Sequence, residues 1–196
     1  MITIVYLHGF RSSPASIKAT RLVDCVAALP AAVRPALHVP ELQHRPAAAV
    51  GGVAQWVERN ADPSTVTFIG SSLGGYYATH LAERFGARAA MINPAVRPYR
   101  DLQTWRGTQT NLYTGAVFEV TQAHFDELVA LSVARITRPA RYFLLVETGD
   151  EVLDYREAVA FYGGAYQYVR GGGDHTFTEF TVQIPAILRF AGVADG

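Results

Sequence analysis

Residues 67–76 read TFIGSSLGGY, and this stretch decides the fold. A strand pattern runs into GSSLG at residues 70–74, and a helical pattern follows. A serine at such a sharp turn has its hydroxyl lifted above the sheet, and the residues two positions away on either side must be small. Glycines meet this demand around Ser72, whereas centring the motif on Ser71 would place Ile69 and Leu73 there. We therefore predict Ser72 as a nucleophile, although a glycine-rich turn that merely packs a helix on a sheet is the alternative.

Short runs of β-branched and aromatic residues alternate along the chain with longer segments of helical periodicity. Strands are predicted at residues 2–7, 36–39, 65–69, 89–92, 142–146 and 165–169. Helices are predicted at residues 16–28, 47–59, 73–85, 155–162 and 177–190, with Pro185 kinking or shortening the last one. Right-handed crossovers between parallel strands then give an α/β fold: an open, doubly wound, mostly parallel sheet of about six strands with helices on both faces.

One stretch interrupts this rhythm between Asn93 and Ala140. It contains several prolines and glycines and, at residues 122–130, a helical pattern. It is too long for a plain loop, so we predict a small insertion of about residues 97–138, near the site and before the fifth strand. With no repeat or linker to divide the chain, residues 1–196 are expected to form one domain.

A serine nucleophile needs a base, and the base needs an acid that fixes its tautomer. Asp150 follows the fifth predicted strand and His175 follows the sixth. The order Ser72, Asp150, His175 is that of an α/β-hydrolase, and all three lie beyond carboxyl ends of strands. Three other carboxylates compete for the acid role: Glu147, Glu151 and Asp154. Of these, Asp154 suits the N-cap of the following helix.

Two backbone N–H groups are the candidates for an oxyanion hole. Leu73 follows the nucleophile at a helix N-terminus, where the helix dipole favours negative charge. Phe10 lies in the loop after the first strand, and Gly9 permits close approach there. The neighbouring His8 is expected to brace this loop rather than act as a base.

Composition excludes several function classes. The chain has 17 basic and 17 acidic residues, and Lys18 is the only lysine, so no basic patch for nucleic acid is expected. No signal peptide and no apolar run of membrane-spanning length are predicted, and the single cysteine, expected to be buried on a helix at Cys25, suggests the cytoplasm. Phosphate-loop, dinucleotide and zinc motifs are absent, so neither a cofactor nor a metal is implied.

The sequence resembles the YqiA-like esterase family of small α/β-hydrolases. The matching segments are residues 6–10 (YLHGF) with 12–14 (SSP), 70–78 (GSSLGGYYA), 93–98 (NPAVRP), 113–115 (YTG), 148–156 (TGDEVLDYR), and His175 with Phe177. The resemblance implies esterase activity with Ser72 as nucleophile, Asp150 as acid and His175 as base. Arg11 and Asp174 depart from the family's usual asparagines, which bears on the charge of the substrate and on the basicity of the histidine.

We expect a serine esterase that acts on a small-molecule ester through an acyl-enzyme. A thioesterase using the same residues and a non-catalytic binding protein of this fold are the alternatives. The expected pocket lining is Tyr76, Tyr77, Trp105 or Tyr113, and Asn93 contacts substrate or is structural. A phosphorylated carrier would be held by arginines of the insertion: Arg97, Arg100 and Arg106. The oligomeric state stays open.

Overall fold

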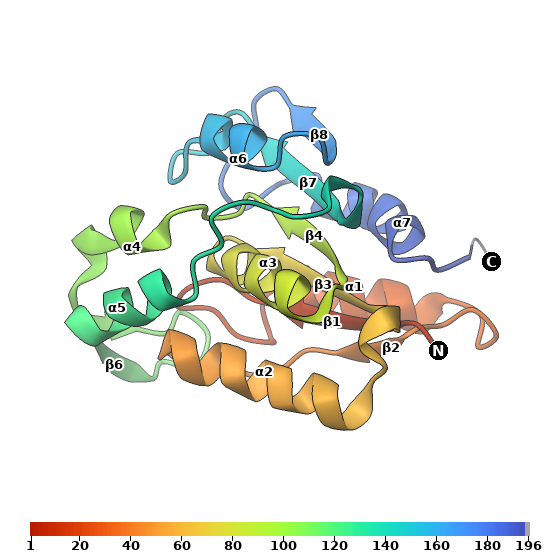
Figure 1. Cartoon of the computed structure of the whole chain (residues 1–196), viewed down its shortest axis with the longest axis horizontal. Helices are drawn as coiled ribbons and strands as arrows, with labels where there is room; N and C mark the ends of the chain where they lie inside the picture. Colours follow the sequence, from red (N-terminus) through yellow and green to blue (C-terminus); the bar gives the residue numbers. More distant parts are fainter. Residues whose placement is uncertain (195–196) are drawn as a thin grey trace.

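The computed structural model describes residues 1–194, so the last two residues of the predicted domain lie outside the described part. Its main sheet has six strands in the order β2-β1-β3-β4-β7-β8, all parallel to their neighbours (Figure 1). The strands are β1 (Thr3–Leu7), β2 (Ala36–His38), β3 (Val66–Ser71), β4 (Arg88–Ile92), β7 (Tyr142–Glu147) and β8 (Tyr166–Arg170). The predicted parallel sheet is confirmed, and every predicted strand is present with ends shifted by at most a residue or two.

Helices cover both faces of this sheet (Figure 1). One face carries α2 (Pro46–Asn60), α3 (Leu73–Phe85) and α6 (Tyr155–Phe161), and the other carries α1 (Ile17–Ala28) and α7 (Phe180–Phe190). Three short 3₁₀ helices are η1 (Pro63–Thr65), η2 (Gln103–Trp105) and η3 (Pro139–Arg141). The last helix begins later than predicted because Phe177 has a left-handed backbone, with φ of 59°. It continues through Pro185 to Phe190.

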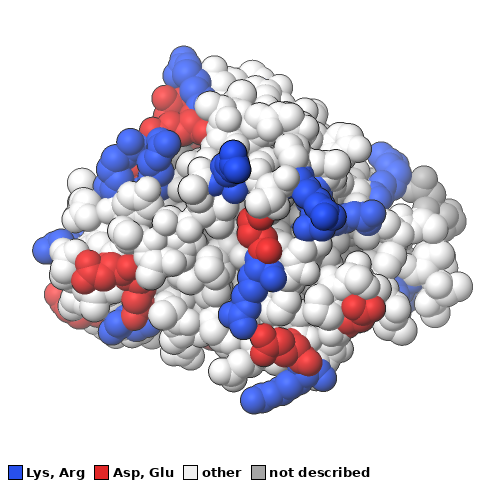
Figure 2. Space-filling view, in the orientation of Figure 1, with Lys and Arg blue, Asp and Glu red and all other residues white. Residues whose placement is uncertain are grey.

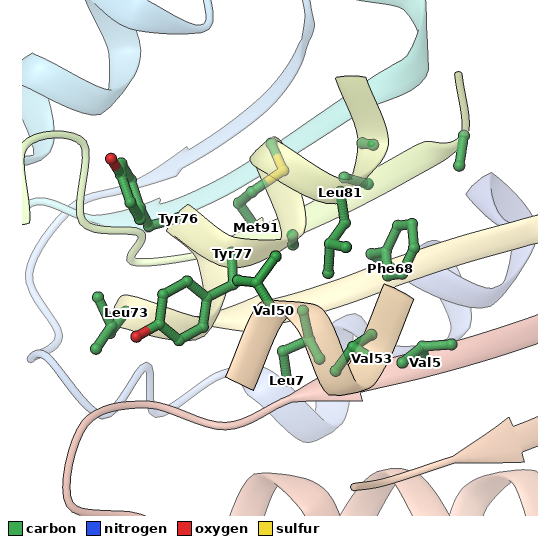
Figure 3. Close-up of a cluster of buried hydrophobic side chains, with 14 of the residues drawn as sticks. Val5, Leu7, Val50, Val53, Phe68, Leu73, Tyr76, Tyr77, Leu81 and Met91 are labelled. Atoms are coloured by element: carbon green, nitrogen blue, oxygen red, sulfur yellow. The ribbon is translucent and has the colours of Figure 1, made fainter. Parts of the chain in front are cut away.

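The core forms two layers because successive residues of a strand point to opposite faces. In β1, Val5 and Leu7 join the cluster under α2 and α3, whereas Ile4 and Tyr6 join the cluster under α1 and α7. Figure 3 shows the first cluster. Full burial of each large side chain contributes roughly 1.5–3 kcal/mol, so these layers hold the strand ends in register.

The predicted insertion folds into α4 (Pro98–Asp101), η2, β5 (Gly107–Thr110), β6 (Val117–Val120) and α5 (Gln122–Ala130). The two strands form an antiparallel hairpin that the sequence reading missed. The turn of the hairpin is tied to the loop after β1, because Leu112 N–H donates to the Arg11 carbonyl at 2.9 Å and Asn111 Nδ2 donates to the Ser12 carbonyl at 2.7 Å. The insertion therefore lies over the carboxyl edge of the sheet (Figure 1).

The surface carries intermixed charges. Figure 2 shows Lys and Arg side chains interspersed with Asp and Glu on the face that it presents. None of the helices within residues 1–194 has the length and apolar character needed to cross a bilayer. Cys25 is half-buried on α1 rather than buried, which corrects the sequence-based expectation, because it lies at the edge of the face that packs on the sheet.

Candidate active site

Ser72 occupies the sharp turn between β3 and α3. Its backbone has φ 55° and ψ −121°, a strained conformation for a residue with a side chain. A Cβ on Gly70 would lie 2.2 Å from the Gly74 carbonyl oxygen, and one on Gly74 would lie 2.1 Å from the Leu7 carbonyl oxygen. Both glycines are therefore required by backbone contacts, which is the physical basis of the pattern that singled out Ser72.

The structure brings together three of the predicted site residues. His175 Nε2 lies 3.0 Å from Ser72 Oγ, and His175 Nδ1 lies 2.9 and 3.0 Å from the two carboxylate oxygens of Asp150. The Asp150 side chain is 2% exposed and the His175 side chain 21%. A buried carboxylate at Nδ1 favours the tautomer with the proton there, which leaves the Nε2 lone pair facing the serine hydroxyl.

The three carboxylates that compete with Asp150 for the role of the acid have other partners. Asp154 caps α6 by accepting from Arg156 N–H, as expected from the sequence, and Glu151 accepts from the His175 backbone N–H at 3.0 Å. Glu147 is fully buried and points beneath the loop that carries His175. Asp150 itself also accepts from two backbone N–H groups of the following turn, at 2.9 Å each, which fixes its carboxylate in place.

Glu147 holds the loop that carries His175. Its Oε2 accepts from the backbone N–H groups of Asp174 and Thr178, and its Oε1 accepts from Arg170 and from the Thr178 hydroxyl. Burial opposes ionisation of this carboxyl, but the hydrogen bonds from Asp174, Arg170 and Thr178 outweigh it and lower the pKa of Glu147. A charged carboxylate therefore anchors the loop from inside the protein.

Asn93 ties the same loop to the end of β4. Its Nδ2 donates to the carbonyl oxygens of Asp174 and His175, at 2.9 and 3.2 Å, and its Oδ1 accepts from Glu147 N–H at 3.0 Å. The side chain is buried, and both hydrogens of the amide have acceptors. Two roles were expected for Asn93, and these contacts fit the structural role rather than contact with substrate.

The two residues predicted for the oxyanion hole lie where neighbouring strand ends meet. Leu73 begins α3, so its N–H is one of the first-turn donors that have no partner within the helix. Gly9 lies against the turn, because a Cβ there would be 3.3 Å from the Ser72 Cβ. His8 braces the loop before Phe10: its Nε2 accepts from Leu42 N–H, and burial lowers its pKa, which favours the neutral ring.

Two clefts meet at Phe10. One has a volume of about 380 Å³ and is lined by Ser72, His175 and Tyr113, with the start of α1 on its far wall. The other, of about 410 Å³, runs between the hairpin and the loop after β2 and includes Leu73 and Tyr77. Site and clefts lie between β1 and β3, where the chain order in the sheet reverses, which is the usual ligand position in open parallel sheets.

Tyr76 is not at either cleft, which corrects its expected role in lining the pocket. It is buried, and its hydroxyl donates to the Leu128 carbonyl at 2.5 Å, so it packs α3 against α5. In Figure 3 its ring points away from that of Tyr77, which does line a cleft. Helical periodicity explains the difference, since adjacent residues of a helix point about 100° apart. Trp105 packs on Phe10 instead of facing Ser72.

The arginines expected to hold a phosphorylated carrier are engaged elsewhere. Arg97 and Arg100 both pair with Glu157, and Arg106 donates to Gln122. The guanidinium of Arg11 donates to the Thr110 carbonyl at 2.8 Å, which holds the hairpin. These four arginine side chains therefore contact other parts of the protein and stabilise the fold around the site.

Comparison with known proteins supports this fold. A model of a family described as "Uncharacterised protein family (UPF0227)" matches residues 3–192. The chain belongs to this family, and the family resemblance found in the sequence is confirmed. Dipeptidyl aminopeptidase B of Saccharomyces cerevisiae is 30% identical over 103 residues, which is 51% of this chain and 12% of the yeast protein.

Two solved structures have the same fold. Alpha/beta hydrolase domain-containing protein 10 from mouse has a TM-score of 0.73 at 17% identity, over 97% of this chain and 89% of the mouse chain. The Est1E protein of Butyrivibrio proteoclasticus, with ferulic acid bound, has a TM-score of 0.70 at 14% identity, over 97% of this chain and 88% of that chain. The UPF0227 chain therefore has the α/β-hydrolase fold that was predicted.

Sequence reasoning missed the anchoring role of Glu147 and the position of Lys18 in the cleft with Ser72. The sequence contained a feature that could have drawn attention to each residue. Glu147 ends an otherwise apolar strand, where a charged side chain needs partners, and Lys18 is the only lysine of the chain.

Proposed function

We propose that this UPF0227 protein is a single-domain serine esterase that hydrolyses small carboxylic esters through an acyl-enzyme. The observation that carries the proposal is the hydrogen-bond chain from Ser72 Oγ through the His175 ring to the buried Asp150 carboxylate. The proposal is supported by the proteins of the same fold, which include esterases and other hydrolases. The free Cys25 is in keeping with a reducing compartment such as the cytoplasm.

The reaction follows from this geometry in two steps. Nε2 of His175 takes the proton of Ser72 Oγ as the oxygen attacks the ester carbonyl carbon, and Asp150 stabilises the imidazolium that forms. The same ring then gives its proton to the leaving alcohol. Water next attacks the acyl carbonyl carbon while His175 takes its proton. The bond from that carbon to Ser72 Oγ then breaks, the ring returns the proton to the serine oxygen, and the carboxylic acid leaves. The backbone N–H groups of Leu73 and Phe10 stabilise the oxyanion in both steps, and loss of one such donor typically slows turnover about a hundredfold to a thousandfold.

A fluorophosphonate probe tests the nucleophile. Wild-type protein is expected to be labelled, and the Ser72→Ala variant is not. The Ser71→Ala variant is the matched control, because it removes a hydroxyl from the same turn and should keep the label. Labelling of Ser72→Ala, or its loss in Ser71→Ala alone, would reject the assignment.

Steady-state assays test the base and the substrate class. With aryl esters and acyl thioesters of increasing acyl length, replacing Ser72 or His175 by alanine should reduce kcat by several orders of magnitude. His80→Ala is the control, because the ring of His80 faces the Leu131 carbonyl, away from Ser72. Near-normal activity of His175→Ala together with inactivity of His80→Ala would overturn the assignment of the base.

A further inference from the structure

Large apolar side chains are exposed around the cleft that contains Ser72 and His175. Leu112 and Tyr113 line this cleft from the turn of the hairpin, and Ile17 lines it from the start of α1. Leu112 is 70% exposed, Tyr113 47% and Ile17 71%. We call these three residues the apolar rim. None of them takes part in the reaction steps proposed above, so their chemistry bears on which ester enters the cleft.

The grouping of these side chains is what points to a ligand. Exposed apolar residues that stand alone are common on protein surfaces, whereas a group of them beside a cleft is typical of a binding site. The members of the apolar rim come from two elements that are distant in the sequence, and they line one cleft together with the nucleophile. Covering apolar surface that faces water is favourable. The apolar rim therefore indicates an apolar group of the substrate in this cleft.

The backbone that carries Leu112 and Tyr113 is already fixed. Leu112 N–H donates to the Arg11 carbonyl at 2.9 Å, and Asn111 Oδ1 accepts from Tyr113 N–H at 2.9 Å. Asn111 Nδ2 donates to the Ser12 carbonyl at 2.7 Å. Because this turn is held by hydrogen bonds within the protein, the free energy gained by covering the two side chains is not offset by ordering of the turn.

The charged side chains of the same cleft are compensated. Lys18 Nζ donates to the Thr176 carbonyl at 2.5 Å. Three carboxylates lie near its ammonium group: those of Asp174, Glu147 and Asp150. Arg21 is exposed, so water solvates its guanidinium group. A charged substrate therefore gains little here, and contact with the apolar rim is the interaction that distinguishes one ester from another.

The position of His175 indicates which half of the ester lies against the apolar rim. The leaving oxygen must lie next to His175 Nε2, which protonates it. His175 lines the cleft of the apolar rim but not the second cleft, which is lined by Leu73 of the predicted oxyanion hole. We propose that the apolar rim binds an alkyl chain carried by the alcohol half of the ester, while the acyl group lies toward the second cleft; this inference rests on the proposed esterase function.

Two series of esters test this placement. The first keeps the acyl group as butyrate and lengthens the alcohol from propyl to hexyl, and the second keeps the alcohol as propyl and lengthens the acyl group from butyrate to heptanoate. Wild-type kcat/KM should rise about twofold per methylene in the alcohol series. Full burial of a methylene would give about fourfold, but the apolar rim is partly open to solvent. Simple n-alkyl alcohols leave with closely similar chemistry, so this slope measures binding.

Variants of the apolar rim locate the effect. Leu112→Ser and Ile17→Ser should each reduce the slope of the alcohol series, and the double variant should nearly abolish it, while the slope of the acyl series stays unchanged. Both side chains are largely exposed, so these variants should fold as the wild type does. Val129→Ser is the matched control, because Val129 is an exposed apolar side chain on α5 that lies outside both clefts.

Two results would overturn the proposal. One is an alcohol slope that is unchanged in the double variant, or reduced no more than the acyl slope. The other is activity that appears only above the solubility limit of the ester, because the apolar rim would then contact an aggregated surface rather than a single substrate molecule. All slopes are therefore measured below that limit.

A binding measurement separates this inference from the proposed function. NMR titration of n-alkanols, from 1-butanol to 1-octanol, into Ser72→Ala requires no turnover, and the methyl signals of Leu112 and Ile17 report the site. The Kd should fall about twofold per methylene in Ser72→Ala and hardly change with chain length when Leu112→Ser and Ile17→Ser are added. If esters are not hydrolysed but this difference is present, the esterase proposal fails and the apolar rim stands as a binding site. If esters are hydrolysed and the alkanols shift neither methyl signal, the proposed role of the apolar rim is refuted.

Discussion

Removal of the Glu147 carboxylate should cost more stability than removal of any other acidic side chain near the site. Glu147 is fully buried and accepts four hydrogen bonds, two of them from the backbone N–H groups of Asp174 and Thr178. In Glu147→Ala these two donors lose their acceptor, at about 1–3 kcal/mol each. Arg170 is 34% exposed and regains water. We expect a loss of about 3–5 kcal/mol, within the range for breaking a buried pair on one side.

Glu147→Gln should recover no more than part of this loss. Each carboxylate oxygen of Glu147 faces two donors, Arg170 and the Thr178 hydroxyl on one side and the two backbone N–H groups on the other. An amide has one oxygen and one NH₂ group, so one side of the site would place donors against a donor. Whichever way the glutamine turns, part of the network is lost.

Urea unfolding of wild type and variants measures these differences. Glu179→Gln is the matched control, because Glu179 pairs with the same Arg170 at 3.3 Å on the exposed side and should cost less than about 1 kcal/mol. If the free energy of unfolding of Glu147→Ala is within 1 kcal/mol of that of Glu179→Gln, the carboxylate does not anchor the His175 loop and the reasoning is wrong.

The pH dependence of stability is a second test of the role of the Glu147 carboxylate. The folded-state pKa of Glu147 is lowered, since its hydrogen bonds and Arg170 outweigh burial. The stabilisation is therefore fully present above the unfolded pKa of about 4.3 and is lost as pH falls through the folded pKa. Unfolding free energy of the wild type should fall more steeply below about pH 5 than that of Glu147→Gln, and parallel curves would contradict the ionised state.

Three further outcomes are expected. Gly74→Ala should unfold the turn or cost several kcal/mol, measured by thermal denaturation, because its Cβ would lie 2.1 Å from the Leu7 carbonyl oxygen; a fully stable variant would contradict the turn geometry. Tyr76→Phe should lose about 1–2 kcal/mol of stability with KM unchanged, since its hydroxyl bonds the Leu128 carbonyl and not a ligand. Asp150→Asn should lower kcat about 10⁴-fold without unfolding, since an amide favours the wrong tautomer, and near-normal turnover would point to another acid.

The sequence was sufficient to predict those features that depend on local constraints. Strand and helix order follows from periodicity, and the turn at Ser72 follows from the glycines on either side, which backbone contacts require. The positions of Asp150 and His175 follow from their places after strands, because parallel strands bring their carboxyl ends to one edge. These predictions needed no knowledge of side-chain packing.

What the sequence did not reveal depends on packing between distant segments. Tyr76 and Tyr77 are adjacent and chemically alike, and their roles differ through the direction in which α3 turns each ring. The β5-β6 hairpin has strands of four residues, and β5 (GTQT) has no large apolar side chain, so it has no apolar alternation to detect. Its hydrogen bonds to the loop after β1 join residues about a hundred positions apart.

The placement of the base explains why so many polar groups surround it. His175 stands on a loop that follows the edge strand β8, which has a neighbouring strand on one side only. Glu147 holds this loop from beneath, Asn93 holds its carbonyl groups, and Lys18 holds Thr176 from the side of α1. These contacts come from the ends of β7 and β4 and from α1, so the position of the base depends on packing between segments that are distant in the sequence.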